Sequence, residues 1–161
     1  MESTANKKGK SVIFLYSYHH MNTQKIGNVI AEKLSAELIT VNDKIKADDY
    51  KNCDLYGFGA GIDSGKHYRQ ILEFAGKFPA VQKKRAFIFS TSGIYSEKKM
   101  AKDHKALRDI LLKKGFVIIG EFSCRGFNTN SVLKIFGGMN KGHPDNVDLK
   151  NAETFIEKLI Q

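Results

Sequence analysis

Residues 17–23 have the side chains and the position to bind a small anion. The segment follows an apolar run at 12–16 and contains hydroxyl groups, an amide and two adjacent histidines, but no carboxylate. A helical pattern of apolar residues begins directly after it, so the N–H groups at a helix start and the positive end of the helix dipole should converge there. These features favour a phosphate site. The alternative is that Asn22 or Thr23 only caps the helix.

Two further polar segments, 61–65 and 90–96, each follow a later apolar run. Their residues are small, hydroxylated or aromatic, which suits a phosphate together with a flat ring. Segment 17–23 has neither the G-x-x-x-x-G-K-[ST] nor the G-x-G-x-x-G pattern, so neither of these nucleotide-binding motifs applies to it.

Short apolar runs alternate with helical patterns along the chain, which predicts a parallel sheet with right-handed crossovers. Strands are expected at 12–16, 37–41, 54–60, 86–89 and 116–120. Ligands bind such sheets beyond the carboxyl ends of the strands. Because 17–23, 61–65 and 90–95 all leave those ends, and 124–126 leaves a neighbouring one, we expect them to form one site.

Several residues mark the limits of these elements. Gly115 should end the helix around 106–111, and Asp148 should cap the last helix. Gly57 and Gly59 in the third strand indicate close approach of a backbone or a ligand, or tight helix packing. The long irregular segment from Cys124 to Val147 is expected to be functional or mobile.

The composition is that of a soluble globular protein. The chain has 161 residues, of which 42% are hydrophobic and 27% charged. We expect one domain over 10–161, preceded by a disordered basic leader at 1–9. No apolar run approaches the ~20 residues needed to span a bilayer, and the first residues lack the apolar region of a secretory signal. These features favour the cytoplasm.

The net charge is informative about partners and not about the fold. A net charge of +9 fits nucleic acid, an acidic protein partner or an anionic cofactor. The lysines are scattered, which is more typical of a solvated surface than of a nucleic-acid stripe.

Cys53 and Cys124 are too few and too far apart for a disulfide framework. Arg125 could lower the pKa of Cys124, but nothing else nearby in the sequence suggests a catalytic thiol.

The sequence resembles the flavodoxin family over nearly its whole length, from Lys10 to the last helix. The resemblance rests on Ser17-x4-Asn22-Thr23, on 57–62 and on 90–93. It implies a three-layer α/β sandwich whose five-stranded parallel sheet has the order 2-1-3-4-5. It also implies bound FMN and electron transfer with redox partner proteins, which the basic charge of this chain suggests are acidic.

The resemblance also implies roles for single residues. Those expected to contact the cofactor are Ser17, Tyr18, His19, His20, Asn22, Thr23, Gly61, Ile62, Thr91, Ser92, Gly93 and Tyr95. Ser17, Asn22 and Thr23 would bind the phosphate, with His19 and His20 beside it. Ile62 and Tyr95 would flank the ring, and 91–93 would meet the ribityl chain and the ring edge. Gly61 would let the peptide that it forms with Ile62 reorient on reduction.

The first segment departs from the family pattern S-x-T-G-N-T. The spacing from Ser17 to Asn22 is one residue longer, no glycine precedes Asn22, and His19 and His20 occupy the space. Both histidines could compensate a phosphate, or one could pack over the turn while the other faces water. As metal ligands they are too few. Asp63 could lower the flavin potential, or it could be a solvated turn residue.

Three function classes follow from these observations. The first is an FMN-binding electron carrier. The second is a flavin-dependent NAD(P)H or quinone reductase, in which the Cys124–Val147 segment would build a substrate pocket. The third is a phosphoacceptor signalling module with the same strand order, but such modules need acidic residues at the end of the first strand, where this chain has Tyr16 and Ser17. Net charge alone favours a nucleic-acid role, and we expect none.

Overall fold

The computed structural model describes residues 9–129 and 131–161, and most of the expected leader therefore lies outside the described residues. Five parallel strands form the sheet in the order β2-β1-β3-β5-β6, which confirms the predicted topology. They are β1 (Ser11–Tyr16), β2 (Glu37–Thr40), β3 (Leu55–Asp63), β5 (Lys84–Ser92) and β6 (Phe116–Arg125). A two-residue strand that the sequence pattern did not predict, β4 (Lys66–His67), pairs antiparallel with the end of β3.

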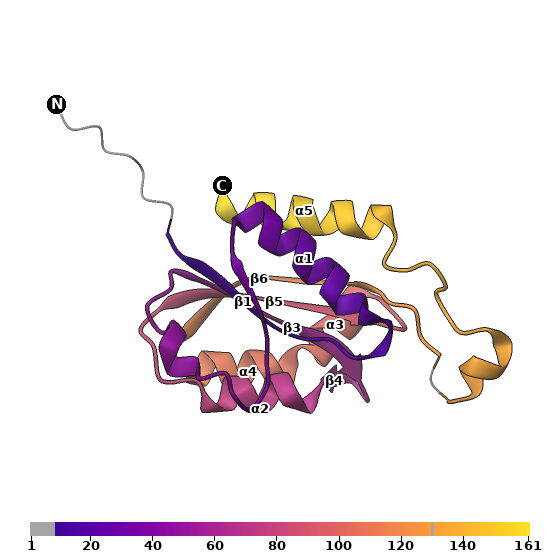
Figure 1. The fold of residues 1–161 in the computed structure, drawn as a ribbon, viewed down its shortest axis with the longest axis horizontal. Coiled ribbons are helices and arrows are strands. Elements are labelled where there is room, and N and C mark those ends of the chain that lie inside the picture. The colour runs from indigo at the N-terminus through magenta and orange to yellow at the C-terminus, as the bar shows by residue number, and fades with distance from the viewer. Residues whose placement is uncertain (1–8, 130) are drawn as a thin grey trace.

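Helices cover both faces of the sheet, as Figure 1 shows. One face carries α1 (Asn22–Leu34) and α5 (Asn146–Ile160), and the other carries α2 (Arg69–Lys77), α3 (Glu97–Asp103) and α4 (Lys105–Lys113). Short 3-10 turns lie at η1 (His19–Met21), η2 (Ala47–Tyr50) and η3 (Ser131–Phe136). Among the described residues, every helix is too short or too polar to cross a membrane.

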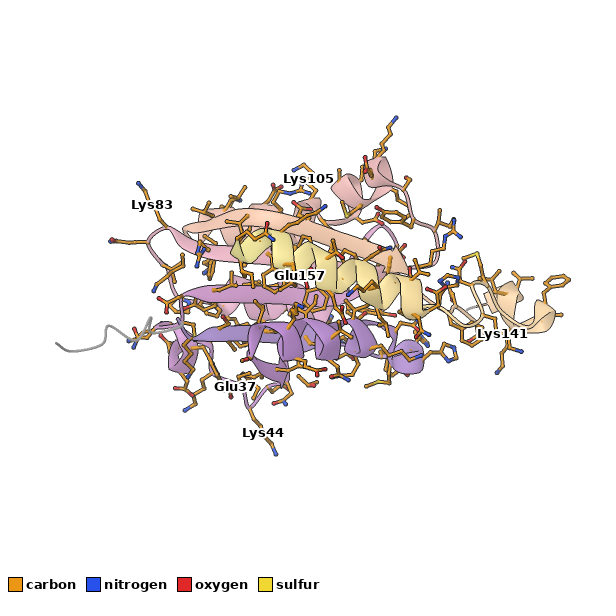
Figure 2. The ribbon with its side chains drawn as sticks, turned by 90° about the horizontal axis from the view of Figure 1, so that it is seen from above. Glu37, Lys44, Lys83, Lys105, Lys141 and Glu157 are labelled. Atoms are coloured by element: carbon orange, nitrogen blue, oxygen red, sulfur yellow. The ribbon has the colours of Figure 1, made fainter. Side chains whose placement is uncertain are left out.

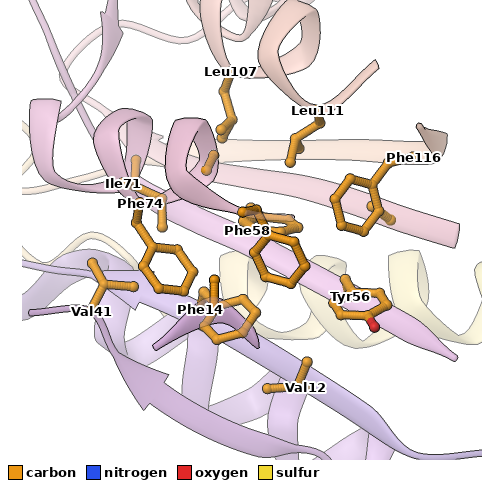
Figure 3. Close-up of a cluster of buried hydrophobic side chains, with 14 of the residues drawn as sticks. Val12, Phe14, Val41, Tyr56, Phe58, Ile71, Phe74, Leu107, Leu111 and Phe116 are labelled. Atoms are coloured by element: carbon orange, nitrogen blue, oxygen red, sulfur yellow. The ribbon is translucent and has the colours of Figure 1, made fainter. Parts of the chain in front are cut away.

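Aromatic rings fill the core between the sheet and helices α2 and α4 (Figure 3). The ring of Phe14 lies 4.6 Å from that of Phe74, and the ring of Tyr56 lies 5.1 Å from that of Phe116. The hydroxyl of Tyr56 donates a 2.8 Å hydrogen bond to the carbonyl of Tyr50, so its polar end is satisfied although the residue is buried. This core fixes the sheet whose carboxyl edge holds the polar segments.

Gly57 and Gly59 make room for rings of the neighbouring strand and not for a ligand. A Cβ added at Gly57 would lie 2.5 Å from the Phe87 ring, and one at Gly59 would lie 2.2 Å from the Phe89 ring. Both phenylalanines are fully buried in the second core cluster, beneath α1 and α5. The glycines therefore allow two phenylalanines to pack across the face of β3.

Several strands extend further than the apolar runs indicated. Ser90, Thr91 and Ser92 belong to β5 and not to a loop, because they pair with residues 123–125 of β6. Cys124 lies within β6 for the same reason, and residues 61–63 continue β3 into the hairpin with β4. Hydroxyl side chains are compatible with a strand, so apolar runs alone underestimated the strand lengths.

Two expected helix ends can be checked directly. Gly115 follows α4 with φ +93, a left-handed conformation that favours glycine, and this confirms the prediction. The cap predicted for α5 was wrong. Asp145 is the N-cap, and its side chain accepts hydrogen bonds from the backbone N–H groups of Val147 and Asp148. Asp148 instead completes the reciprocal capping box.

We predict opposite effects for alanine at two glycines. Gly59→Ala should lower the free energy of unfolding by about 1–3 kcal/mol, because its Cβ would force the buried Phe89 ring to move. Gly76→Ala is the control. It adds a methyl group within α2 where no atom lies within 4 Å, and it should stabilise by about 0.5–1 kcal/mol. Urea denaturation of both variants checks this, and equal effects of the two substitutions would contradict the packing account.

Candidate functional site

Residues 17–21 form a tight turn before α1. His20 and Met21 have φ values of +53 and +52, so two consecutive side-chain-bearing residues are left-handed. Helix α1 begins at Asn22, and the N-cap residue Met21 makes no side-chain capping hydrogen bond. The expectation that Asn22 or Thr23 caps α1 was therefore wrong. The hydroxyl of Ser17 caps the start of α1 instead, because it accepts a 3.2 Å hydrogen bond from the backbone N–H of Gln24.

The side chains of Asn22 and Thr23 point toward other segments instead. The Asn22 amide donates a 2.8 Å hydrogen bond to the carbonyl of Phe127. The Thr23 and Thr91 hydroxyls lie 2.8 Å apart and share a buried hydrogen bond. The first turn of α1 is thereby joined to the end of β5 and to the chain that leaves β6.

A pocket opens where these segments meet. It is lined by Ser17, Tyr18, His19, Asn22, Thr23, Gly61, Ile62, Tyr68, Thr91, Ser92, Gly93, Gly126, Phe127 and Asn128. All twelve predicted site residues except His20 and Tyr95 are in this set, so the three polar segments do converge on one cleft. Their individual cofactor contacts stay predictions.

His20 and Tyr95 lie elsewhere. The Nε2 atom of His20 is 2.8 Å from the Thr129 hydroxyl, and its ring is 4.4 Å from that of Phe127. His20 thus packs against the segment after β6, while His19 lines the pocket. Tyr95, 39% exposed, lines a separate groove together with Cys124. The reason is the longer β5, which places Tyr95 beyond the turn that follows Ser92.

Cys124 does not reach the cleft as a reactive thiol. It is buried in β6, and burial raises its pKa far above the ordinary value, with Asp148 and Asp145 adding to the shift. A thiol that stays protonated is a poor nucleophile. The sequence argument against catalysis by this residue agrees with these observations.

Three residues of the pocket, Tyr68, Phe127 and Asn128, were not predicted from the sequence, whereas Gly126 belongs to the segment 124–126 that was expected to join the site. Tyr68 is at the N-cap position of α2, and its ring lies so close to Gly61 that an added Cβ there would be 2.7 Å away. Its ring also packs edge-on to Tyr16 at 5.7 Å. Gly126, Phe127 and Asn128 follow β6. The position of residues 124–126 at the next strand end was the only signal for this last group, and nothing local marked Tyr68.

The long segment after β6 is attached to the pocket rim. We call residues 126–129 and 131–144 the arm; in Figure 1 it extends beyond the sheet at the right. Asn128 and Met139 pair as an antiparallel bridge, and the Asn140 amide donates a 2.6 Å hydrogen bond to the Gly93 carbonyl. A Cβ at Gly93 would be 2.8 Å from the Met139 methyl group. The arm therefore packs directly on the segment that follows β5.

The chemistry of the lining suits a ligand with a phosphate and hydroxyl groups. Hydroxyls come from residues of three segments, and none of the lining residues carries a carboxylate. The Oδ1 atom of Asn22 is buried and has no hydrogen-bond partner among the described residues. A buried acceptor of this kind favours a hydroxyl donor from a ligand, because leaving it unpaired costs about 1–3 kcal/mol.

A buried polar network supports the end of β5 beneath the pocket. The Ser90 hydroxyl donates to that of Ser123 at 2.8 Å and lies 2.7 Å from Nε2 of His104. Nδ1 of His104 is 2.9 Å from Glu121, which also accepts hydrogen bonds from Arg108. Ser90, His104 and Glu121 are linked in the same order as the members of a catalytic triad, but Ser90 is fully buried. The network is therefore structural.

Glu121 of this network and His67 beside it have lowered pKa values. Burial alone would raise the pKa of Glu121, but hydrogen bonds from Arg108 and His104 outweigh burial and lower it to about 2. His67 packs against His104 at 4.7 Å, and burial lowers the pKa of His67 to about 3. Glu121 is thus charged and His67 neutral at pH 7.

Comparison with known proteins identifies related chains. The sequence matches the family described as Flavodoxin domain over residues 13–157. The uncharacterised protein MJ0298 of Methanocaldococcus jannaschii is 45% identical over 152 residues, which cover 94% of this chain and 99% of that protein.

Two solved structures share the fold. A Fusobacterium nucleatum flavodoxin bound to flavin mononucleotide has a TM-score of 0.64 at 14% identity and covers 94% of this chain and 97% of its own. Rubredoxin oxygen:oxidoreductase of Desulfovibrio gigas has a TM-score of 0.66 at 17% identity, covering 93% of this chain but 35% of its own. The same fold therefore occurs as an independent protein and within a larger oxidoreductase chain.

We predict that Glu121 makes stability depend on pH in the acid range. Because its pKa is lower in the folded chain, its contribution is complete above the ordinary value near 4.5 and is lost as the pH falls toward 2. At pH 7 the Glu121→Gln variant should unfold with a free energy about 3 kcal/mol below that of the natural protein. Near pH 2 this difference should vanish.

Denaturant unfolding of both proteins from pH 7 to pH 2 measures this difference. Glu37→Gln is the matched control, since Glu37 is exposed on β2 at the edge of the sheet (Figure 2). A difference between the natural protein and Glu121→Gln that stays constant over the whole range would show that the charge of Glu121 does not stabilise the fold.

Proposed function

This chain belongs to the flavodoxin family, and on that premise we propose that it binds FMN in the pocket and carries electrons between other proteins. One observation supports the proposal most strongly. Three polar segments that are far apart in the sequence line a single cleft at the carboxyl ends of β1, β3 and β5. A ligand at this place is expected for an open α/β sheet.

The phosphate of FMN would lie at the start of α1. Ser17, His19, Asn22 and Thr23 line this part of the cleft. The positive end of the helix dipole favours an anion there, and the segment carries no carboxylate. His20 would contribute to phosphate binding from outside the pocket lining, since its ring contacts Thr129 and Phe127.

The ring would lie between the segments after β3 and β5. Ile62 at the end of β3, Tyr68, Ser92 at the end of β5 and Gly93 all line the pocket. Tyr68 replaces Tyr95 as the aromatic candidate for a ring contact, because Tyr68 lines the pocket and Tyr95 does not. An aromatic face next to a planar ring is a favourable packing arrangement.

Bound FMN supplies the redox chemistry, and the protein sets its potential through nearby charges and hydrogen bonds. Asp63 is the carboxylate that the sequence places next to the ring segment. It is exposed, lies outside the set of pocket residues, and accepts a 3.2 Å hydrogen bond from the Ser64 hydroxyl. These observations favour the interpretation of Asp63 as a solvated turn residue. Asp63→Asn should therefore leave both midpoint potentials of the bound flavin unchanged.

A flavin-dependent reductase is the second candidate. Phe127 and Asn128 of the arm form part of the cleft wall, as a substrate pocket above the ring would require. Stopped-flow mixing with NADPH and NADH separates the two functions. Rapid bleaching of the bound flavin without a partner protein would favour the reductase, and slow bleaching would favour the carrier.

We predict that the protein binds FMN more tightly than riboflavin, because only FMN carries the phosphate. Titration of flavin fluorescence gives both affinities. Ser17→Asp places a carboxylate at the proposed phosphate position and should weaken FMN binding by about 10- to 100-fold while leaving riboflavin binding nearly unchanged.

Ser17→Asn is the matched control for this charge. Both substitutions keep an acceptor for the backbone N–H of Gln24, so both should preserve the turn. If Ser17→Asp and Ser17→Asn weaken FMN binding equally, or if riboflavin binds as tightly as FMN, the phosphate does not bind at this segment.

A further inference from the structure

The arm ends in an apolar tip that projects into solvent. Three large side chains of η3 form it, and their exposed fractions are 63% for Val132, 80% for Ile135 and 80% for Phe136. Single exposed apolar residues are common, but several large ones together on one projecting turn mark an interaction site. We call these three residues the apolar tip.

The charged residues of the arm are of one sign. The arm contains Lys134 and Lys141 but no carboxylate. Lys134 lies within η3, and Figure 2 shows Lys141 at the arm. A surface of this kind attracts an acidic partner, and the attraction should weaken with salt.

The base of the arm is attached to the rim of the cleft. It contributes Phe127 and Asn128 to the pocket lining, and Asn140 binds the carbonyls of Gly93 and Gly126 at 2.6 and 3.3 Å. Because both ends of the arm are attached to the rim, a molecule that docks along the whole arm would also reach the mouth of the pocket.

We propose that the arm is the docking surface for an acidic redox protein, which covers the apolar tip and pairs its carboxylates with Lys134 and Lys141. This inference rests on the proposed function, since it assigns the partner of the same cleft. A second copy of the chain fits less well, because two arms would bring lysines together on chains of net charge +9. A membrane fits less well, because three apolar side chains anchor a protein weakly to a bilayer.

The test uses an acidic plant-type [2Fe–2S] ferredoxin as the probe. Calorimetric titration of the flavin-free protein with oxidised ferredoxin measures docking without any redox step. Stopped-flow mixing of reduced ferredoxin with the FMN-loaded protein then measures electron transfer, in which one electron leaves the iron–sulfur cluster and enters the flavin. Failure to bind FMN would affect only the second measurement, so it is distinguishable from failure to dock.

Two double variants probe the surface. Lys134→Glu/Lys141→Glu should weaken ferredoxin binding by at least about tenfold at low ionic strength and reduce its salt dependence. Ile135→Ser/Phe136→Ser should weaken it by about tenfold with the salt dependence unchanged. Lys44→Glu/Lys83→Glu changes the net charge equally, away from the arm (Figure 2), and should alter binding less than about threefold.

Several results would overturn the proposal. One is that the natural protein does not bind ferredoxin at low ionic strength, and another is that the arm variants bind it as tightly as the Lys44→Glu/Lys83→Glu control. Phosphatidylglycerol vesicles that bind the natural protein but not the arm variants, with no docking of ferredoxin, would assign the arm to a membrane. Sedimentation showing a dimer that the Ile135→Ser/Phe136→Ser variant loses would assign it to self-association.

Discussion

The buried hydrogen bond between the Thr23 and Thr91 hydroxyls is the contact on which the site depends. It joins the first turn of α1 to the end of β5 at 2.8 Å, and the neighbouring Asn22 amide extends the connection to Phe127 after β6. Three segments of a small domain could otherwise leave their strands in different directions. Asn22 and Thr23 hold the start of α1, the end of β5 and the chain after β6 around one cleft. The buried network at Ser90 supports β5 beneath the cleft.

The sequence predicted the sheet well because the central strands β1, β3 and β5 are largely apolar and buried. It also predicted which segments converge, since parallel strands bring their carboxyl ends to one edge. The sequence did not predict that β5 continues through its hydroxyl-bearing residues, because Ser90 and Thr91 resemble loop residues until their pairing with β6 is known. Tyr68 was unpredictable for another reason: its place in the pocket depends on the β3–β4 hairpin and the start of α2.

Neither the cleft lining nor the arm contains a carboxylate. The arm adds cations and an apolar tip. An anionic cofactor and an acidic partner would be attracted by the same surface, although they would bind different parts of it. Two of the 26 lysines and arginines, Lys134 and Lys141, lie on the arm.

A crystal structure of the protein soaked or grown with FMN tests the central claim most directly. The account predicts the phosphate at the start of α1, within hydrogen-bond distance of the Ser17 hydroxyl and of backbone N–H groups of that turn. It also predicts the ring between Ile62 and Gly93. FMN bound instead in the groove beside Tyr95 and Cys124, or with its phosphate away from residues 17–23, would contradict the account.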